Sequence, residues 1–211
     1  MRASAAAVFV TLFVGSAVCA AVTNPNGPRN AQHQAEQKSP VELLVAAAID
    51  GDRARVGEIA LRIKAQARLP RGNRHKARDL NEHGLALWQR SRYNEAAAYF
   101  RQAREADPGD AEIAENLGYS LIKSGHVAEA EQPILDALSM APDRASAWGS
   151  LGMIYAKQGK HRQGVALVLT AYSYARDPKR TAGVYSRLAA SDEDPKVRAM
   201  LAEVVSKLPG T

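Results

Sequence analysis

The apolar positions of this chain recur at helical spacing along most of its length. Leu117 and Leu121 are four residues apart, so they share one face of a helix. Similar stripes, each spaced for one side of a helix, occur at Val56, Ile59, Ala60 and Ile63, and at Val197, Met200, Leu201 and Val204. A composition dominated by alanine, leucine, glutamate, lysine and arginine agrees with these patterns. The sequence therefore predicts an all-α chain.

Small residues and prolines recur every 34 residues in the middle of the chain. The columns are Gly84, Gly118 and Gly152; Ala96, Ala130 and Gly164; Ala103, Ala137 and Ala171; and Pro108 with Pro142. Small side chains let two antiparallel helices approach closely, and a proline cannot continue the helix before it. We therefore predict three helix-turn-helix repeats, at residues 77–110, 111–144 and 145–178.

This 34-residue pattern resembles the tetratricopeptide repeat family over roughly residues 77–178. The second repeat matches best, with Leu117-Gly118, Leu121, Gly125, Ala130, Ala137 and Pro142, and the third adds Trp148, Leu151-Gly152, Tyr155 and Gly159. The first repeat departs from the pattern, because His83 replaces a usual leucine and Ser91 a usual turn glycine. The resemblance implies an α-solenoid. Pro133 lies inside the second helix of repeat two, where we expect a kink or a late helix start.

Helix pairs are expected on both sides of the repeats. The first, at residues 39–68, opens with the capping box Ser39-Pro40-Val41-Glu42 and is expected to cap the solenoid at its N-terminal end. A loop at 69–76 would join it to the repeats. The last pair, at residues 179–208, is expected to cap the C-terminal end, with Asp194 starting its second helix.

Residues 1–20 have the features of a secretory signal peptide. Arg2 precedes an apolar run, and Val18 and Ala20 suit cleavage before Ala21. The alternative is an uncleaved anchor helix, since the apolar stretch approaches the roughly 20 residues that a membrane span needs. Residues 21–38, rich in Asn, Gln and Pro, are expected to be a disordered leader. The sequence thus predicts a periplasmic or secreted protein, whose single cysteine, Cys19, is removed with the signal.

The sequence offers no pattern for catalysis, for a cofactor or for a metal ion. It contains no P-loop, dinucleotide fingerprint or metalloprotease motif. His126 and His161 fall in turns, where polar residues are ordinary, and the acidic run 192–194 suits a helix start. The formal net charge is +6, but the middle of the chain is acidic and the basic residues lie in the two flanks. A nucleic-acid channel would more often have its cations along one continuous face. We therefore predict a protein that is not an enzyme.

The resemblance also implies a concave surface lined by the first helix of each repeat. The expected partner-binding residues are Arg78, Asn81, Leu85, Trp88 and Gln89; Glu112, Glu115, Tyr119, Ile122 and Lys123; and Met153 and Lys157. Leu85, Tyr119 and Met153 would form an apolar stripe, which commonly marks a protein-binding site. The alternative is that these residues pack against the next repeat. Asn81 and Leu85 stand where chaperone-tail receptors of this family have Lys and Asn, which argues against capture of such tails.

Three functions remain open at this point. The first is an exported adaptor or scaffold that binds a protein or peptide partner in cell-envelope assembly, such as pilus, secretion or outer-membrane machinery. The second is a stable structural subunit of an envelope complex. The third is binding of nucleic acid or an anionic surface through the basic flanks, including Arg71, Arg74, His75 and Lys76.

Overall fold

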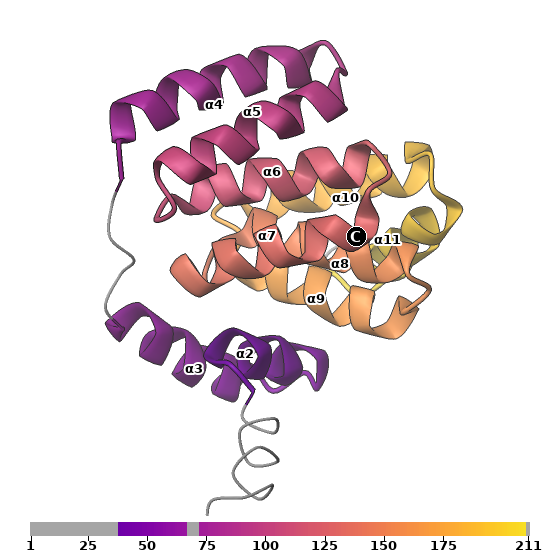
Figure 1. Ribbon diagram of the computed structural model, residues 1–211. Helices are drawn as coiled ribbons and strands as arrows, with labels where there is room; N and C mark the ends of the chain where they lie inside the picture. Colours follow the sequence, from indigo (N-terminus) through magenta and orange to yellow (C-terminus); the bar gives the residue numbers. More distant parts are fainter. Residues whose placement is uncertain (1–37, 67–71, 210–211) are drawn as a thin grey trace, which may run out of the picture. The chain divides into compact units, whose positions relative to one another are not determined.

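The computed structural model describes residues 38–66 and 72–209, and within them it contains ten helices and no strand (Figure 1). The helices are α2 Pro40–Ile49, α3 Arg53–Ala65, α4 Arg74–Gln89, α5 Tyr93–Ala106, α6 Ala111–Lys123, α7 Val127–Met140, α8 Ala145–Lys157, α9 His161–Ser173, α10 Pro178–Ser191 and α11 Pro195–Ser206. This confirms the all-α prediction. The signal peptide and the leader up to Gln37 lie outside the described residues. No helix in the described part is both long and apolar enough to cross a membrane.

Helices α4 to α9 form three hairpins, α4–α5, α6–α7 and α8–α9, which follow one another in the order of the predicted repeats. The tight turns contain Ser91, Gly125 and Gly159, whose φ angles are 57°, 87° and 81°. Glycine adopts this left-handed conformation without steric cost, whereas serine does not. Ser91, which the sequence marks as a departure from the repeat, thus adopts the conformation that glycine has in the other two turns.

The recurring glycines sit where two helices of a hairpin touch. A Cβ atom on Gly118 would lie 2.6 Å from Ile134 Cδ1, and one on Gly152 would lie 2.5 Å from Val168 Cγ2. Gly84 stands against Phe100 in the same way. These distances are shorter than any normal carbon contact, so the close approach of the helices requires glycine.

The second helix of repeat two begins at Val127 and runs through Pro133 to Met140. The expectation of a late start is therefore wrong. Pro133 is the seventh residue of α7, and it is buried beside Ile134 in the core. Helix α7 packs against both α6 and α8, and this packing offsets the loss of the one backbone hydrogen bond that proline cannot make.

The N-terminal pair α2–α3 has the predicted helices but not the predicted neighbours. The capping box forms: the Glu42 amide donates to Ser39 Oγ at 3.3 Å, and the Ser39 amide donates to Glu42 Oε2 at 2.6 Å. The pair packs against α7 and α9, the second helices of repeats two and three, instead of stacking ahead of repeat one as an end cap. Helix α4 begins at Arg74, inside the stretch expected to be a loop.

The C-terminal pair agrees with the sequence in its helices and differs in its packing. Val197, Met200, Leu201 and Val204 of α11 are fully buried, as predicted, and α11 contacts both α9 and α8. Helix α10, by contrast, buries only Tyr185 and has few contacts with α9. Thus α11 covers the last repeat, while α10 projects to the side where the first helices of the repeats are exposed.

Candidate partner-binding groove

The twelve predicted site residues lie on α4, α6 and α8, but they differ in accessibility. Asn81, Glu115 and Ile122 are only 2%, 8% and 3% exposed. The other nine, which are exposed or half-buried, are Arg78, Leu85, Trp88, Gln89, Glu112, Tyr119, Lys123, Met153 and Lys157. Ile122 belongs to the core. Of the twelve predicted residues, only the nine accessible ones could contact a partner.

An aromatic cluster joins the first two repeats. The rings of Trp88 and Tyr119 stack with centroids 5.8 Å apart, and Tyr93 meets the edge of Trp88 at 5.8 Å. Lys123 Nζ lies 5.8 Å from the centroid of the Tyr93 ring, within reach of a cation–π contact. None of these rings is fully buried. Two repeats therefore present one apolar surface with a cation at its side.

A small hollow opens in this surface. It has a volume of about 200 Å³ and is lined by Leu85, Trp88, Phe100, Asn116 and Tyr119. Burial, together with the charges of Asp192 and Tyr93, raises the pKa of Tyr119. Its hydroxyl therefore stays protonated at neutral pH and can both donate and accept a hydrogen bond.

Several predicted contact residues already have partners within the chain. Arg78 binds Asp110 at 3.0 Å and Glu112 at 3.4 Å, and Arg144 pairs with Glu115. Asn116 Nδ2 donates to Asn81 Oδ1 at 3.0 Å. Each of these contacts joins the first helix of one repeat to the first helix of the next or to its N-cap residue, so the polar residues on this side stabilise the packing of successive first helices.

Lys157 is also engaged, by the start of the last helix. Its Nζ donates to Asp194 Oδ2 at 3.0 Å, while the other carboxylate oxygen of Asp194 accepts from the Lys196 amide at 2.8 Å. Burial opposes ionisation of Asp194, but the hydrogen bonds from Lys157 and from the α11 amides hold its pKa below the ordinary value. The acidic run 192–194 thus serves as the predicted helix start.

A larger cleft, which the sequence does not predict, lies between α6, α8 and α10. Its volume is about 600 Å³. Its walls include Tyr119 from α6, Gly149 and Met153 from α8, and Val184 and Leu188 from α10. The apolar residues Val184, Tyr185 and Leu188 line it, and they lie in the stretch 179–208 for which the sequence predicts only a cap.

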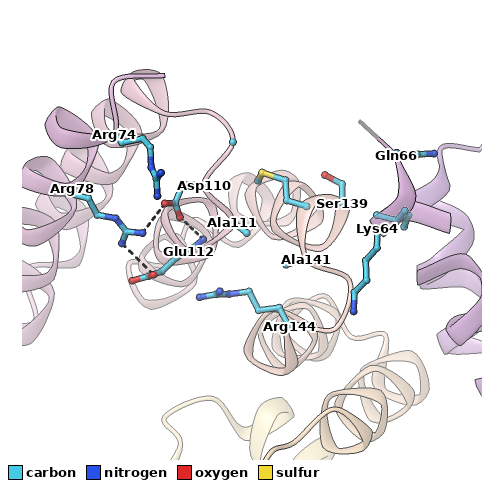
Figure 2. A pocket seen from close by; sticks show the side chains of 13 residues that line it. Lys64, Gln66, Arg74, Arg78, Asp110, Ala111, Glu112, Ser139, Ala141 and Arg144 are labelled. Atoms are coloured by element: carbon cyan, nitrogen blue, oxygen red, sulfur yellow. Dashed lines mark hydrogen bonds and ion pairs between the residues drawn. The ribbon is translucent and has the colours of Figure 1, made fainter. Parts of the chain in front are cut away.

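A third hollow, of about 540 Å³, is rich in charge (Figure 2). It is lined by Lys64 of α3, by Arg74 and Arg78 of α4, and by Arg144 just before α8, beside the carboxylates of Asp110 and Glu112. Lys64 pairs with Asp143 at 2.7 Å. Of its cations, only Arg74 has no ion pair with another described residue. Carboxylates on or beside this hollow thus balance most of its positive charge.

The described residues hold no group of three or more side chains suited to a metal ion. His161 instead pairs with Glu203 of α11 at 2.7 Å, and His126 contacts Ser124 at 3.1 Å. His83 is exposed and lies beside Tyr99, with ring centroids 5.6 Å apart. The histidines that the sequence singles out therefore make ordinary structural contacts.

Comparison with known families and structures identifies the repeats. The tetratricopeptide repeat family model matches residues 81–145 and 115–181. No curated protein sequence matches the chain. Among solved structures, the type III secretion chaperone SycD of Yersinia enterocolitica, in complex with a peptide of the translocator YopD, is similar at 15% identity and a TM-score of 0.50, covering 62% of this chain and 92% of that one.

Two further structures are similar at lower scores. PilF of Pseudomonas aeruginosa has 19% identity and a TM-score of 0.44, covering 82% of this chain and 76% of its own. The tetratricopeptide domain of OM64 from Arabidopsis has 13% identity and a TM-score of 0.47, covering 65% of this chain and 100% of its own. At such low identity these likenesses concern the fold alone.

Proposed function

Because this chain is a tetratricopeptide repeat protein, we propose that it is an exported adaptor that binds a segment of a protein partner on the exposed side of α4 and α6. The observation that carries this proposal is the surface formed by Leu85, Trp88 and Tyr119. Half-buried aromatic residues that cluster around a hollow are typical anchors of protein interfaces. The surface spans two repeats, so a bound segment would contact both.

The chemistry of this surface favours a peptide over a small metabolite. The hollow of about 200 Å³ is below the usual size of a small-molecule site, but it can take one apolar side chain. Asn116 and the Tyr119 hydroxyl supply hydrogen-bonding groups beside it. SycD, which has the same fold, is bound to a peptide of its translocator. A linear segment that inserts one apolar anchor fits these features.

The place of action follows from the predicted signal peptide. With residues 1–20 removed, the adaptor would work in the periplasm or outside the cell, serving the assembly of pilus, secretion or outer-membrane machinery. The proposal involves neither catalysis nor a cofactor.

A pair of exposed glutamines provides a matched test. Gln89 lies on the proposed surface, whereas Gln102 lies on α5. We would place a photo-crosslinking amino acid at either position in the exported protein and identify the products by mass spectrometry. A discrete crosslinked partner from position 89 and none from position 102 is expected. Equal products from both positions would contradict the proposed surface.

Substitution then tests which side chains carry the contact. Replacing Leu85, Tyr119 and Met153 by Ser is expected to abolish the crosslink from position 89 while helicity is retained. Leu61→Ser removes an exposed leucine on α3 and serves as the control. A large loss of melting temperature in the triple variant would show that these residues belong to the core.

A further inference from the structure

Helix α10 turns the far end of the groove into a cleft with two facing walls. Over the earlier repeats, the hollow is lined by residues of α4, α5 and α6. At repeat three, Thr181, Val184 and Leu188 of α10 face the cleft whose other walls come from α6 and α8. The floor includes Gly149, where a Cβ atom would meet nothing closer than the Tyr185 hydroxyl at 4.0 Å. Small floor residues leave the cleft deep enough for a chain segment.

The α10 wall is held mainly by its own hairpin partner. It packs on α11 and contributes to the cluster that contains Met153, Val197 and Met200. Tyr185 is its one buried residue, and burial raises the pKa of this tyrosine to about 12. Between this anchor and α8 the space of about 600 Å³ stays open. The wall is therefore fixed in place without filling the groove.

The rim of this wall is positively charged. Helix α10 spans the sequence PKRTAGVYSRLAAS, which has three cations and no acidic residue. Arg180 and Arg187 are four residues before and three residues after Val184, so they lie on the same side of the helix as this cleft-lining residue, about 10 Å apart along it. Arg176 lines the cleft itself. All three arginines are exposed. Arg176 lies near Asp143, whose pKa is lowered by the hydrogen bond from Lys64 and further by the charge of Arg176, and Asp143, Glu115 and Arg144 also line the cleft. The charges at that end of the cleft are therefore balanced, and the added positive charge of the wall comes from Arg180 and Arg187.

We propose that the cleft between α8 and α10 binds a peptide segment of the partner in which acidic residues flank an apolar anchor. The apolar side chain would contact Met153, Val184 and Leu188. The acidic residues would pair with Arg180 and Arg187. This inference rests on the proposed function, and it extends the binding surface from α4 and α6 to a wall outside the three repeats.

The occupant follows from charge complementarity. Opposite charges at the rim of an interface select partners and accelerate association. A basic or neutral segment would gain only the apolar contact and would make no ion pair with Arg180 and Arg187. An acidic membrane surface could also attract arginines, but it is too broad to enter a cleft whose apolar residues face inward.

The probe is a display library of random linear peptides, selected on the full chain. We expect the enriched peptides to carry Asp or Glu on both sides of an aromatic or aliphatic residue. Arg180→Glu with Arg187→Glu should weaken their binding by about tenfold, and added salt should weaken it in the parent. Lys179→Glu makes the charge change of one of these two substitutions on another side of α10, and it should alter affinity less than about twofold. Circular dichroism of each variant checks that the helices remain.

The outcomes separate this inference from the proposed function. Enriched peptides that are neutral or basic, or that bind the double variant as well as the parent, would overturn the α10 cleft. If Trp88→Ala abolishes the binding of these same peptides, the proposed surface on α4 and α6 stands. Enrichment of no peptide would overturn both. Binding to phosphatidylserine vesicles that the double variant loses, without acidic peptides, would assign the arginines to a membrane surface instead.

Discussion

Ser91 occupies a backbone position at which the other repeats use glycine. Its φ of 57° lies in the left-handed region, where a side chain costs about 1 kcal/mol or more. The sequence marks this site correctly, because the 34-residue repeat places Ser91 in register with Gly125 and Gly159. A one-residue departure in a repeat thus pointed to a strained turn.

We predict that Ser91→Gly raises the free energy of unfolding by up to about 1 kcal/mol, since relief of the strained φ outweighs the added entropy of the unfolded chain. Gly125→Ser makes the opposite change in the next turn and should destabilise by a similar amount. Chemical denaturation of both variants measures this. A loss of stability in Ser91→Gly would mean that the contact between Tyr93 and Ser91, at 3.3 Å, matters more than the strain.

Gly152 offers a second test, of close packing. Adding a methyl group there places a carbon 2.5 Å from Val168 Cγ2, and Val168 is fully buried and cannot turn away. We predict that Gly152→Ala destabilises by about 1–3 kcal/mol in spite of alanine's better helix propensity. Gly183, in α10, has open space at its Cβ position. Gly183→Ala should therefore stabilise by up to about 1 kcal/mol, and equal effects at both glycines would contradict the packing explanation.

The sequence predicts where the helices lie better than it predicts which helices pack against each other. Local signals such as the Ser39 capping box and the Asp194 cap act within a few residues, so the sequence locates helix starts. Which surface a helix covers depends on contacts far away in the chain. The stripe Val56, Ile59 and Ile63 shows that α3 is buried on one side but not that the pair packs on α7 and α9. The same holds for the candidate site. The repeat pattern predicts that Leu85 and Tyr119 lie on the binding surface, but it does not predict the wall formed by α10, which depends on contacts outside the repeats.

Helix α11 carries most of the C-terminal cap. Four of its side chains are buried to 0% exposure, and it covers α9 and α8. We predict that deleting residues 195–211 exposes this apolar surface and lowers the melting temperature or causes aggregation. Size-exclusion chromatography and thermal unfolding measure both effects. An unchanged melting temperature with monomeric elution would show that α11 is dispensable.

The two proposals together place the binding surface over α4, α6, α8 and α10. Leu85 and Trp88 provide an open apolar part over α4 and α6, and α10 provides a walled part over α8. The ion pair of Arg78 with Asp110 joins α4 to the N-cap of α6. A partner segment that follows this side would meet an apolar surface first and a basic rim last. Direction of binding would therefore be set by the position of acidic residues in the partner.

The proposed export would determine which partners this surface can meet, and it depends on residues outside the described structure. We predict that the mature protein begins at or near Ala21, because Val18 and Ala20 are the small residues that a signal peptidase accepts. Intact mass of the protein recovered from the producing cell measures the start. Ala20→Arg places a large charged residue at the cleavage position and should leave Met1 to the end as one uncleaved, membrane-associated chain. A parent protein that keeps residues 1–20 on the membrane would establish an anchor, and the groove would then act at the membrane surface.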